Sequence, residues 1–375
     1  MKKFVLIIIS VLAVDLIISN LIFKNTKYWE NSTWEKKWWR VSSQIYHHKI
    51  LPNIDKKEKW GGKIEKKLYT NSIGFRDKEI RQVEKVNTNK KRILLVGDSF
   101  IEGVGLNYEN TISGLLDEYL NDKYEVLNSG VGSYSPSIYY KKTKYYIDEG
   151  YKFDQALIFL DMSDIFDELF IKFNSNGDIL TFEETKKRSI HKKLFYSLGR
   201  ILRDNSTIFR FFYMLSDRTE IIKNYIKLKF KTSEELNKNF FKTSRDEVMF
   251  YRMTHIDRGF WTYDADKFNE VTKGLEQSEK YLLKLFDLLN ANNIKSTLVI
   301  YPWPTQIFYG DNYNEKHWKD FAKANNIDFL STYDVFKSDD KRKFIFDNFI
   351  YGDIHWNVKG TKIIFDELVK KINFN

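Results

Sequence analysis

The stretch that decides the fold is Arg92-Ile-Leu-Leu-Val-Gly-Asp-Ser-Phe100. Its first five residues predict a buried strand, and the Gly-Asp-Ser that follows predicts a tight turn. Apolar residues then recur at helical spacing from Ile112 to Leu120. A strand, a turn and a helix in this order form the repeating unit of an α/β fold. Ser99 would therefore lie at the carboxyl end of a strand, where parallel sheets bind their ligands.

The same alternation of strands and helices continues through the chain. We predict four more strands, at residues 124–127, 156–160, 296–301 and 327–330. Helices are predicted from Pro136, through 268–289 and at 364–372. This alternation predicts a five-stranded parallel sheet covered by helices on both faces. Residues 174–262 interrupt it as a mainly helical insertion, which is either a lid over the site or a structural elaboration.

The composition is that of a folded protein with one large domain or two small ones. The chain has 375 residues, of which 42% are hydrophobic, so it can bury a sizeable core. It has no cysteine, which excludes disulfides, thiolate metal sites and a cysteine nucleophile. The net charge is +10, but lysine is spread along the whole chain and forms no single basic face. We therefore expect no nucleic-acid partner.

The amino-terminal residues predict a membrane anchor. Residues 4–23 are mostly Ile, Leu and Val, and about 20 helical residues span the ~30 Å hydrocarbon core of a bilayer. A charge at Asp15 costs about 2.5–3.5 kcal/mol on insertion scales, which the surrounding apolar residues can offset. A cleaved signal peptide is the alternative, although its apolar region would be short. We expect a signal anchor at 1–23, a juxtamembrane connection at 24–90, and the main domain at 91–375 outside the cytoplasm.

One histidine lies where a serine nucleophile would need it. A catalytic serine requires a base, and the base requires an orienting acid. Among the six histidines, His355 is the one expected in a loop, with Asp353 two residues before it and a helix after it. His47 and His48 are expected near the membrane segment, with their rings pointing apart. No histidine pair has the spacing of metal ligands on a helix, so we expect neither a metal nor a cofactor.

Together these segments resemble the SGNH hydrolase family, also called the GDSL family. Four blocks are similar to the family's motifs, in the same order and at strand ends: Gly97-Asp98-Ser99, Asn128-Ser-Gly130-Val-Gly132-Ser133, Asp161-Met-Ser163-Asp164 and Asp353-x-His355. The third block differs, because Ser163 stands where the family usually has asparagine. The short spacing in the last block resembles the membrane-anchored branch that includes alginate and other glycan O-acetylation proteins. The segment from Asn71 to Arg76 also resembles that branch, although a turn with Arg76 paired to a carboxylate is its structural interpretation.

The resemblance implies a three-layer α/β/α fold of flavodoxin-like strand order, and acyl chemistry through a seryl ester. Ser99 would attack the acyl carbonyl, His355 would carry the proton, and Asp353 would orient the imidazole. An oxyanion hole is expected from Ser99, Gly132, Ser133 and Ser163, with Ser133 at the position usually filled by glycine. If residues 184–262 form a lid, it would cover the acyl site. Contacts to substrate are expected from Asp164, Arg252 and Arg258.

The resemblance further implies a serine esterase that removes O-acyl groups, such as O-acetyl, from an extracytoplasmic glycan. A glycan O-acetyltransferase with the same residues is an alternative, because water or a sugar hydroxyl can attack the acyl-enzyme. A polytopic membrane acyltransferase would then be its partner. A second alternative is a non-catalytic glycan-binding or assembly protein. The altered third block favours that alternative, whereas the intact Ser99, Asp353 and His355 favour catalysis.

Overall fold

The structure of the chain is a computed structural model. It describes residues 2–22, 39–60, 64–86, 89–175, 177, 179–181, 199, 202, 205–212 and 244–374. The chain divides into two compact units. One unit takes in the described residues of 1–36, 61–64 and 186–251, and the other those of 37–60, 65–185 and 252–375. The five predicted strands and the residues predicted for the site belong to the second unit.

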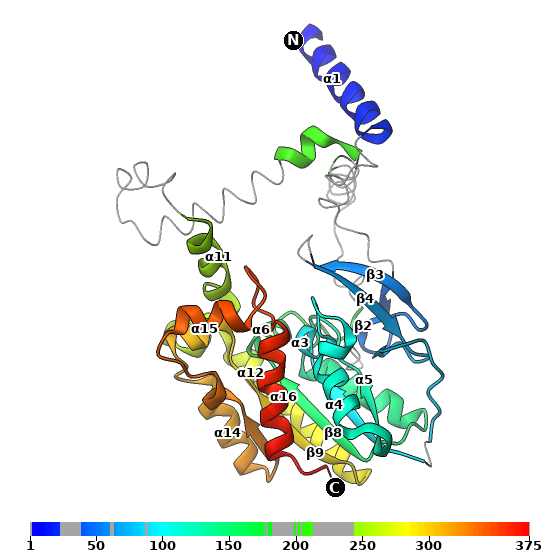
Figure 1. Ribbon diagram of the computed structural model, residues 1–375, viewed down its shortest axis with the longest axis vertical. Coiled ribbons are helices and arrows are strands. Elements are labelled where there is room, and N and C mark those ends of the chain that lie inside the picture. Colours follow the sequence, from blue (N-terminus) through cyan, green and yellow to red (C-terminus); the bar gives the residue numbers. More distant parts are fainter. Residues whose placement is uncertain are drawn as a thin grey trace. The chain divides into compact units, whose positions relative to one another are not determined.

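Five parallel strands form the centre of the second unit (Figure 1). They are β6 (Lys91–Val96), β7 (Tyr124–Asn128), β8 (Gln155–Leu160), β9 (Lys295–Ile300) and β10 (Asp328–Ser331). Their order in the sheet is β7-β6-β8-β9-β10, and each neighbouring pair is parallel. This is the flavodoxin-like order that the resemblance implies. All six residues of β8 are buried, as a central strand with helices on both faces requires.

The whole sheet has eight strands and is mixed, which corrects the expected five-stranded parallel sheet. Beyond β7 it continues through β5 (Arg76–Asp77), β4 (Ile64–Thr70) and β3 (Asp55–Trp60). β5 runs antiparallel to both of its neighbours. A separate antiparallel pair is formed by β1 (Arg40–Ser43) and β2 (His47–Ile50). The sequence hides β3 because its first three residues, Asp-Lys-Lys, are exposed and polar, as edge strands often are.

Helices cover both faces of the parallel strands, as the resemblance implies (Figure 1). On one face, α4 (Ile112–Leu120) packs against α16 (Val358–Lys371). The later crossovers step the other way along the sheet, and right-handed crossovers place their helices on the opposite face. That face carries α5 (Pro136–Asp148), α12 (Ala265–Ala291) and α14 (Asn314–Ala324). Shorter helical segments are α3 (Ser99–Glu102), η2 (Tyr108–Asn110), η3 (Asn121–Lys123), α6 (Met162–Glu168), η5 (Asp257–Thr262), α13 (Pro304–Tyr309), η6 (Tyr333–Phe336) and α15 (Lys341–Asn348).

Caps fix where the helices nearest the predicted site begin. The side chain of Asn357 accepts the backbone N–H groups of Lys359 and Gly360, so α16 starts directly after the loop that carries His355. Pro136 occupies the first turn of α5, where its missing N–H costs nothing. A side-chain cap contributes about 1 kcal/mol to helix stability. The cap of α16 and the proline of α5 therefore fix where the helices after two of the predicted site loops begin.

The first unit contains α1 (Lys2–Leu21) and a helical stretch at 207–212. Asp15 of α1 is only 7% exposed, and its Oδ1 accepts the Ser19 hydroxyl and the Ile208 N–H, both at 3.2 Å. In the described part of the chain, no helix combines the length and the apolar character needed to cross a membrane. The expected anchor and its orientation stay predictions, as do the domain boundaries.

The insertion also lies partly in the first unit. Its described portion includes α11 (Arg245–Thr254), which is helical as expected, and a bridge between Phe173 and Ile179. The expected lid falls largely on residues outside the described part of the chain, so its position over the site stays a prediction.

Candidate active site

Ser99 begins α3, at the turn where β6 ends. The Asp98 side chain caps this short helix by accepting the N–H of Phe100 at 2.9 Å. Gly97 leaves room for the turn, because a Cβ at this position would lie 2.5 Å from the Ile101 side chain. The Ser99 hydroxyl lies 3.0 Å from Asp98 Oδ2. The nucleophile predicted from the sequence is therefore held at the carboxyl end of a parallel strand.

The segment from Asn71 to Arg76 supports the far end of α3. Asn71 Oδ1 accepts the N–H groups of Ile73 and Phe75, and Gly74 takes a left-handed φ of +77°. This turn leads into the buried Arg76. Its guanidinium donates to the carbonyls of Glu102, Gly103 and Leu106. Arg76 thus binds backbone carbonyls at the end of α3 and in the turn that follows it, which corrects the expected pairing with a carboxylate.

Ser99, His355 and Asp353 form a hydrogen-bonded chain. His355 Nε2 lies 2.9 Å from Ser99 Oγ, and His355 Nδ1 lies 2.5 Å from Asp353 Oδ1. A tight loop holds the acid and the base. The N–H of Asp353 donates to the backbone carbonyl of Ile350, and the N–H of Ile350 donates to the backbone carbonyl of His355, each at 2.8 Å. The structure therefore brings together the three residues for which catalytic roles are predicted. Their spacing is that of a nucleophile, a base and an orienting acid.

The second oxygen of Asp353 is held by Trp60, from the end of β3. The indole N–H of Trp60 donates to Asp353 Oδ2 at 2.8 Å, and its ring meets the His355 ring edge-on at 5.4 Å between centroids. Burial alone would raise the pKa of Asp353. Hydrogen bonds from His355 and Trp60, with the positive charge that His355 can carry, outweigh it and lower this pKa to about 2. Asp353 is therefore an anion at neutral pH.

No family model matches this sequence, and no curated protein matches it. A psychrotrophic esterase from a Pseudoalteromonas species is 13% identical, over 75% of this chain and 96% of its own, with a TM-score of 0.37. A member of the lipolytic protein G-D-S-L family from Veillonella parvula is 12% identical, over 76% of this chain and 100% of its own, with a TM-score of 0.37. A carbohydrate acetylesterase family member from Sinorhizobium meliloti is 10% identical, over 74% of this chain and 95% of its own, with a TM-score of 0.36. Similarity at this level assigns neither activity nor substrate to this chain.

Two backbone N–H groups, one in the first and one in the second of the four blocks, have no hydrogen-bond partner within the described residues. They belong to Ser99 and Ser133. Ser133 has a φ of +64°, in the region that glycine adopts freely, which agrees with its place at the family's glycine position. Gly132 lies beside the nucleophile, since a Cβ there would be 3.5 Å from Ser99 Cβ. Its own N–H is already used, because it donates to Glu102 Oε2 at 2.9 Å.

Ser163 is tied to the cap of α6 instead of standing free at the site. Its N–H donates to Asp161 Oδ1 at 2.6 Å, and its hydroxyl also bonds to this carboxylate. Asp164 completes the capping box by accepting the N–H of Asp161 at 2.8 Å. Both side chains are buried. Asp164 therefore lies out of reach of a substrate, and the hydroxyl that would replace the family's asparagine already has an acceptor.

Three buried carboxyl groups cluster behind the nucleophile. Oxygens of Asp98, Asp161 and Asp164 lie within 4.8 Å of one another, a set that could in principle ligate an ion. Burial raises the pKa of each, and negative neighbours raise those of Asp98 and Asp164 further. Protein donors already reach all three: Tyr301 to Asp98, Trp303 to Asp161 and Tyr139 to Asp164. Burial and the neighbouring negative charges thus favour the protonated carboxyl groups, whereas hydrogen bonds from protein donors oppose them by stabilising the charged form.

The two arginines expected to contact substrate have different surroundings. Nη1 of Arg258 donates to both carboxylate oxygens of Asp167, at 3.0 and 3.1 Å. The Arg258 guanidinium lies 6.0 Å from the Trp303 ring centroid. Trp303 in turn donates to Asp161, so Arg258 lies near the third block. Arg252 is exposed on α11. The structure thus connects Arg258, but not Arg252, with the site.

Sequence reasoning missed four residues that contact the predicted site or its loops: Arg40, His48, Trp60 and Glu102. The first three come from the polar segment interpreted as a connection, and no local motif marks them. The expectation that the rings of His47 and His48 point apart is wrong, because their Nδ1 atoms lie 2.7 Å apart. His47 has a φ of +71°, which breaks the strand alternation that would otherwise send neighbouring side chains to opposite faces.

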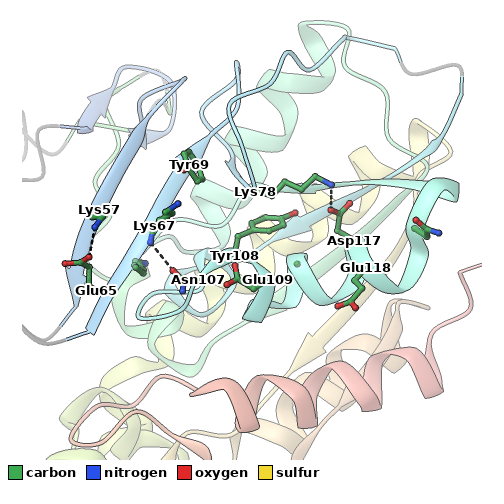
Figure 2. Close-up of a pocket in the computed structure, with 13 residues that line it drawn as sticks. Lys57, Glu65, Lys67, Tyr69, Lys78, Asn107, Tyr108, Glu109, Asp117 and Glu118 are labelled. Carbon is green, nitrogen blue, oxygen red and sulfur yellow. Dashed lines mark hydrogen bonds and ion pairs between the residues drawn. The ribbon is translucent and has the colours of Figure 1, made fainter.

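A separate cavity of about 920 Å³ lies beside β3, β4 and α4 (Figure 2). Most of the residues that line it are charged or polar. Figure 2 shows two ion pairs among them, Lys57 with Glu65 at 3.1 Å and Lys78 with Asp117 at 2.8 Å. None of Ser99, Asp353 and His355 lines it. Because positive and negative side chains of the lining pair with one another, the charge of this cavity favours neither an anionic nor a cationic ligand.

Proposed function

We propose that this protein is a serine ester hydrolase that acts through a covalent acyl-enzyme. The observation that supports it most directly is the chain from Asp353 through His355 to Ser99, with distances of 2.5 and 2.9 Å. The position of Ser99 after a central parallel strand, where substrates of α/β proteins bind, also supports it. A non-catalytic role would leave the aligned base and its anionic partner without purpose.

The proposed reaction has two halves. In the first, Ser99 Oγ bonds to the acyl carbon while His355 Nε2 takes the hydroxyl proton, and the carbonyl oxygen becomes an oxyanion. The N–H groups of Ser99 and Ser133 bind this oxyanion. The ester C–O bond then breaks, and the leaving alcohol receives the proton from His355. In the second half, water attacks the acyl-enzyme by the same steps, which releases the acid and restores Ser99.

The proposed substrate is an O-acyl group, such as O-acetyl, on an extracytoplasmic glycan, and a membrane anchor would hold the enzyme near it. Support comes from the last sequence block and from the first unit. Large apolar side chains are exposed there, which is typical of surfaces that contact lipid or a partner: Val11, Val14, Ile17, Leu21, Phe211 and Phe212. The hydrogen bonds of Asp15 reduce the cost of placing its carboxylate in apolar surroundings.

The test of the activity compares single variants of the full chain with p-nitrophenyl acetate as substrate. Ser99→Ala and His355→Ala should lower turnover by about 10⁴-fold or more, and Asp353→Asn by up to about 10⁴-fold. Ser338→Ala, a half-exposed serine outside the site, is the matched control and should behave as the wild type. A fluorophosphonate should label Ser99. Turnover that survives Ser99→Ala, or labelling of another serine, would overturn the proposal.

Two further measurements test the finer parts of the proposal. Purified enzyme given an acetyl donor and an oligosaccharide should release acetate. Acetylated sugar as the main product would favour the O-acetyltransferase alternative, with a polytopic membrane acyltransferase as the supplier of acetyl groups. Alkaline phosphatase fused after residue 375 should be active if the body lies outside the cytoplasm. Activity of only a cytoplasmic reporter at the same position would contradict the proposed location.

A further inference from the structure

Gly132 is held on both of its polar groups. Its N–H donates to Glu102 Oε2 at 2.9 Å, and its carbonyl lies 2.9 Å from His48 Nε2. Glu102 is fully buried and is itself held by Arg40, whose Nη1 donates to the same Oε2 at 2.9 Å while Nη2 donates to Oε1. The two peptide groups that flank Gly132 are therefore both fixed by side chains from outside their own loop.

The hydrogen positions on the two histidines follow from their partners. Burial lowers the pKa of His48 to about 3, so its ring is neutral and carries a single N–H. The Gly132 carbonyl can only accept, which assigns that N–H to Nε2 of His48. Nδ1 of His48 is then an acceptor, and the donor 2.7 Å away is Nδ1 of His47. His47 therefore donates a hydrogen bond to His48, and His48 donates one to the carbonyl of Gly132.

His48 is itself held in place by Tyr134. The Tyr134 hydroxyl donates to the backbone carbonyl of His48 at 2.7 Å, and the two rings meet edge-on at 4.8 Å between centroids. Lys142 Nζ donates to that hydroxyl at 3.2 Å. The ring that reaches Gly132 is therefore fixed by contacts to its backbone and to its face.

The geometry of the peptide between Gly132 and Ser133 relates the direction of the Gly132 carbonyl to that of the Ser133 N–H. The chain has no cis peptide bond among its described residues, so the carbonyl of Gly132 and the N–H of Ser133 point to opposite sides of one plane. His48 fixes the carbonyl side. The N–H of Ser133 then points away from His48, and it has no hydrogen-bond partner within the described residues.

We infer that His48 is a positioning residue for the oxyanion hole: by donating to the Gly132 carbonyl it aims the N–H of Ser133 at the oxyanion. This inference rests on the proposed function. Glu102, held by Arg40, fixes the preceding peptide from the other side. The hydrogen bonds of the His48 ring go to the Gly132 carbonyl and to His47, so its role is exerted through the peptide. Its loss should affect turnover, which depends on transition-state contacts, more than substrate binding.

The test uses His48→Leu and His48→Gln in the full chain. Removal of an oxyanion donor costs about 10²–10³ in kcat, so His48→Leu should lower kcat with p-nitrophenyl acetate by up to that factor at nearly constant KM. His48→Gln keeps a side-chain N–H donor and should recover most of the loss. His317→Leu is the matched control, because His317 lies on α14 and pairs with Glu279. An unchanged kcat in His48→Leu, or equal losses in both His48 variants, would overturn the inference.

A second measurement does not depend on these variants folding. In wild-type enzyme labelled with ¹⁵N-serine, phosphonylation of Ser99 places an oxyanion mimic in the hole. The Ser133 amide proton should then shift downfield, and the assignment follows from loss of that signal in Ser133→Gly. An amide that does not move in the phosphonylated enzyme would contradict the inference. If Ser99 takes up no phosphonate at all, the proposed function fails instead, so the two failures are distinguishable.

Discussion

The indole N–H of Trp60 donates to Asp353 at 2.8 Å, although 293 residues separate them. The acid of the proposed triad therefore has two donors, His355 on one oxygen and Trp60 on the other. Asp353 stays anionic because both hydrogen bonds favour its charged form. The strand that supplies Trp60 thus supports the acid of the proposed triad and is not merely a connection.

Trp60→Phe should weaken catalysis without abolishing it. The ring contact with His355 is retained, while the N–H to Asp353 is lost. A hydrogen bond to a charged group is worth about 1.5–3 kcal/mol, part of which water can replace, so we expect kcat to fall by about threefold to tenfold. The check is kcat and KM with p-nitrophenyl acetate. A Trp60→Phe enzyme with wild-type kcat would show that the second oxygen needs no protein donor.

Asp98→Asn should flatten the pH dependence of stability. Burial, and next the charge of Asp161, raises the pKa of Asp98 in the folded protein. An acid whose folded pKa is raised binds its proton more tightly in the native state than in the unfolded chain, where its pKa is about 3.9. The stability that Asp98 contributes is therefore complete below its unfolded pKa and is lost as pH rises through its folded pKa.

Urea unfolding of wild type and Asp98→Asn between pH 4 and 8 measures this effect. The wild type should lose stability with rising pH relative to the variant, because the charge that forms on Asp98 is buried and lies beside Asp161 and Asp164. The N–H of Phe100, the nearby His355 and the hydroxyl of Ser99 oppose the trend, because each stabilises the charged form of Asp98. Parallel stability curves for the two proteins would mean that Asp98 is ionised in the native state throughout this range.

Ser163→Ala should leave acylation nearly unchanged. The N–H of Ser163 caps α6, and its hydroxyl bonds to Asp161, so neither is available to an oxyanion. The loss of the hydroxyl bond should cost about 1 kcal/mol of stability. Single-turnover acylation, followed by the burst of p-nitrophenol, measures the rate directly. A loss of about 10²-fold or more would identify Ser163 as an oxyanion donor after all.

Ser133→Gly should keep activity and raise stability. The variant retains the backbone N–H, and glycine adopts a φ of +64° without the steric cost that serine incurs. Because glycine loses more entropy on folding, the net gain should be no more than about 1 kcal/mol. Urea unfolding and kcat test both expectations. Ser135→Gly, at an extended φ of −144°, is the control and should lose stability. Reduced kcat in Ser133→Gly would point to a role for the serine hydroxyl.

The sequence predicts the central strands and the triad for physical reasons. Each parallel strand is buried on both faces and so appears as an apolar run, and β8 is the clearest example. Ser99 and His355 are recognisable because each sits in a short motif beside a strand or helix end. Their 2.9 Å contact could be expected only from the family's strand order, since 256 residues lie between them.

The residues that the sequence does not reveal lie where local pattern carries little information. β3 is a polar edge strand, and Trp60 gains its role only from a partner far along the chain. His48 depends on the left-handed backbone of His47, a conformation that non-glycine residues seldom adopt and that propensity does not predict. The role of Arg40 likewise depends on tertiary pairing with Glu102.

The long sequence separations within the proposed triad have a consequence for how this protein folds. Nucleophile and base are joined across 256 residues, and the acid meets Trp60 across 293. Loop closure over such distances comes late and makes folding slow, because its entropy must be overcome before the contacts form. Folding intermediates should therefore contain the serine without its base and remain inert toward esters. Reaction with a fluorophosphonate would then label only chains that have completed folding. The rate at which labelled chains appear during refolding would measure the rate of that final step.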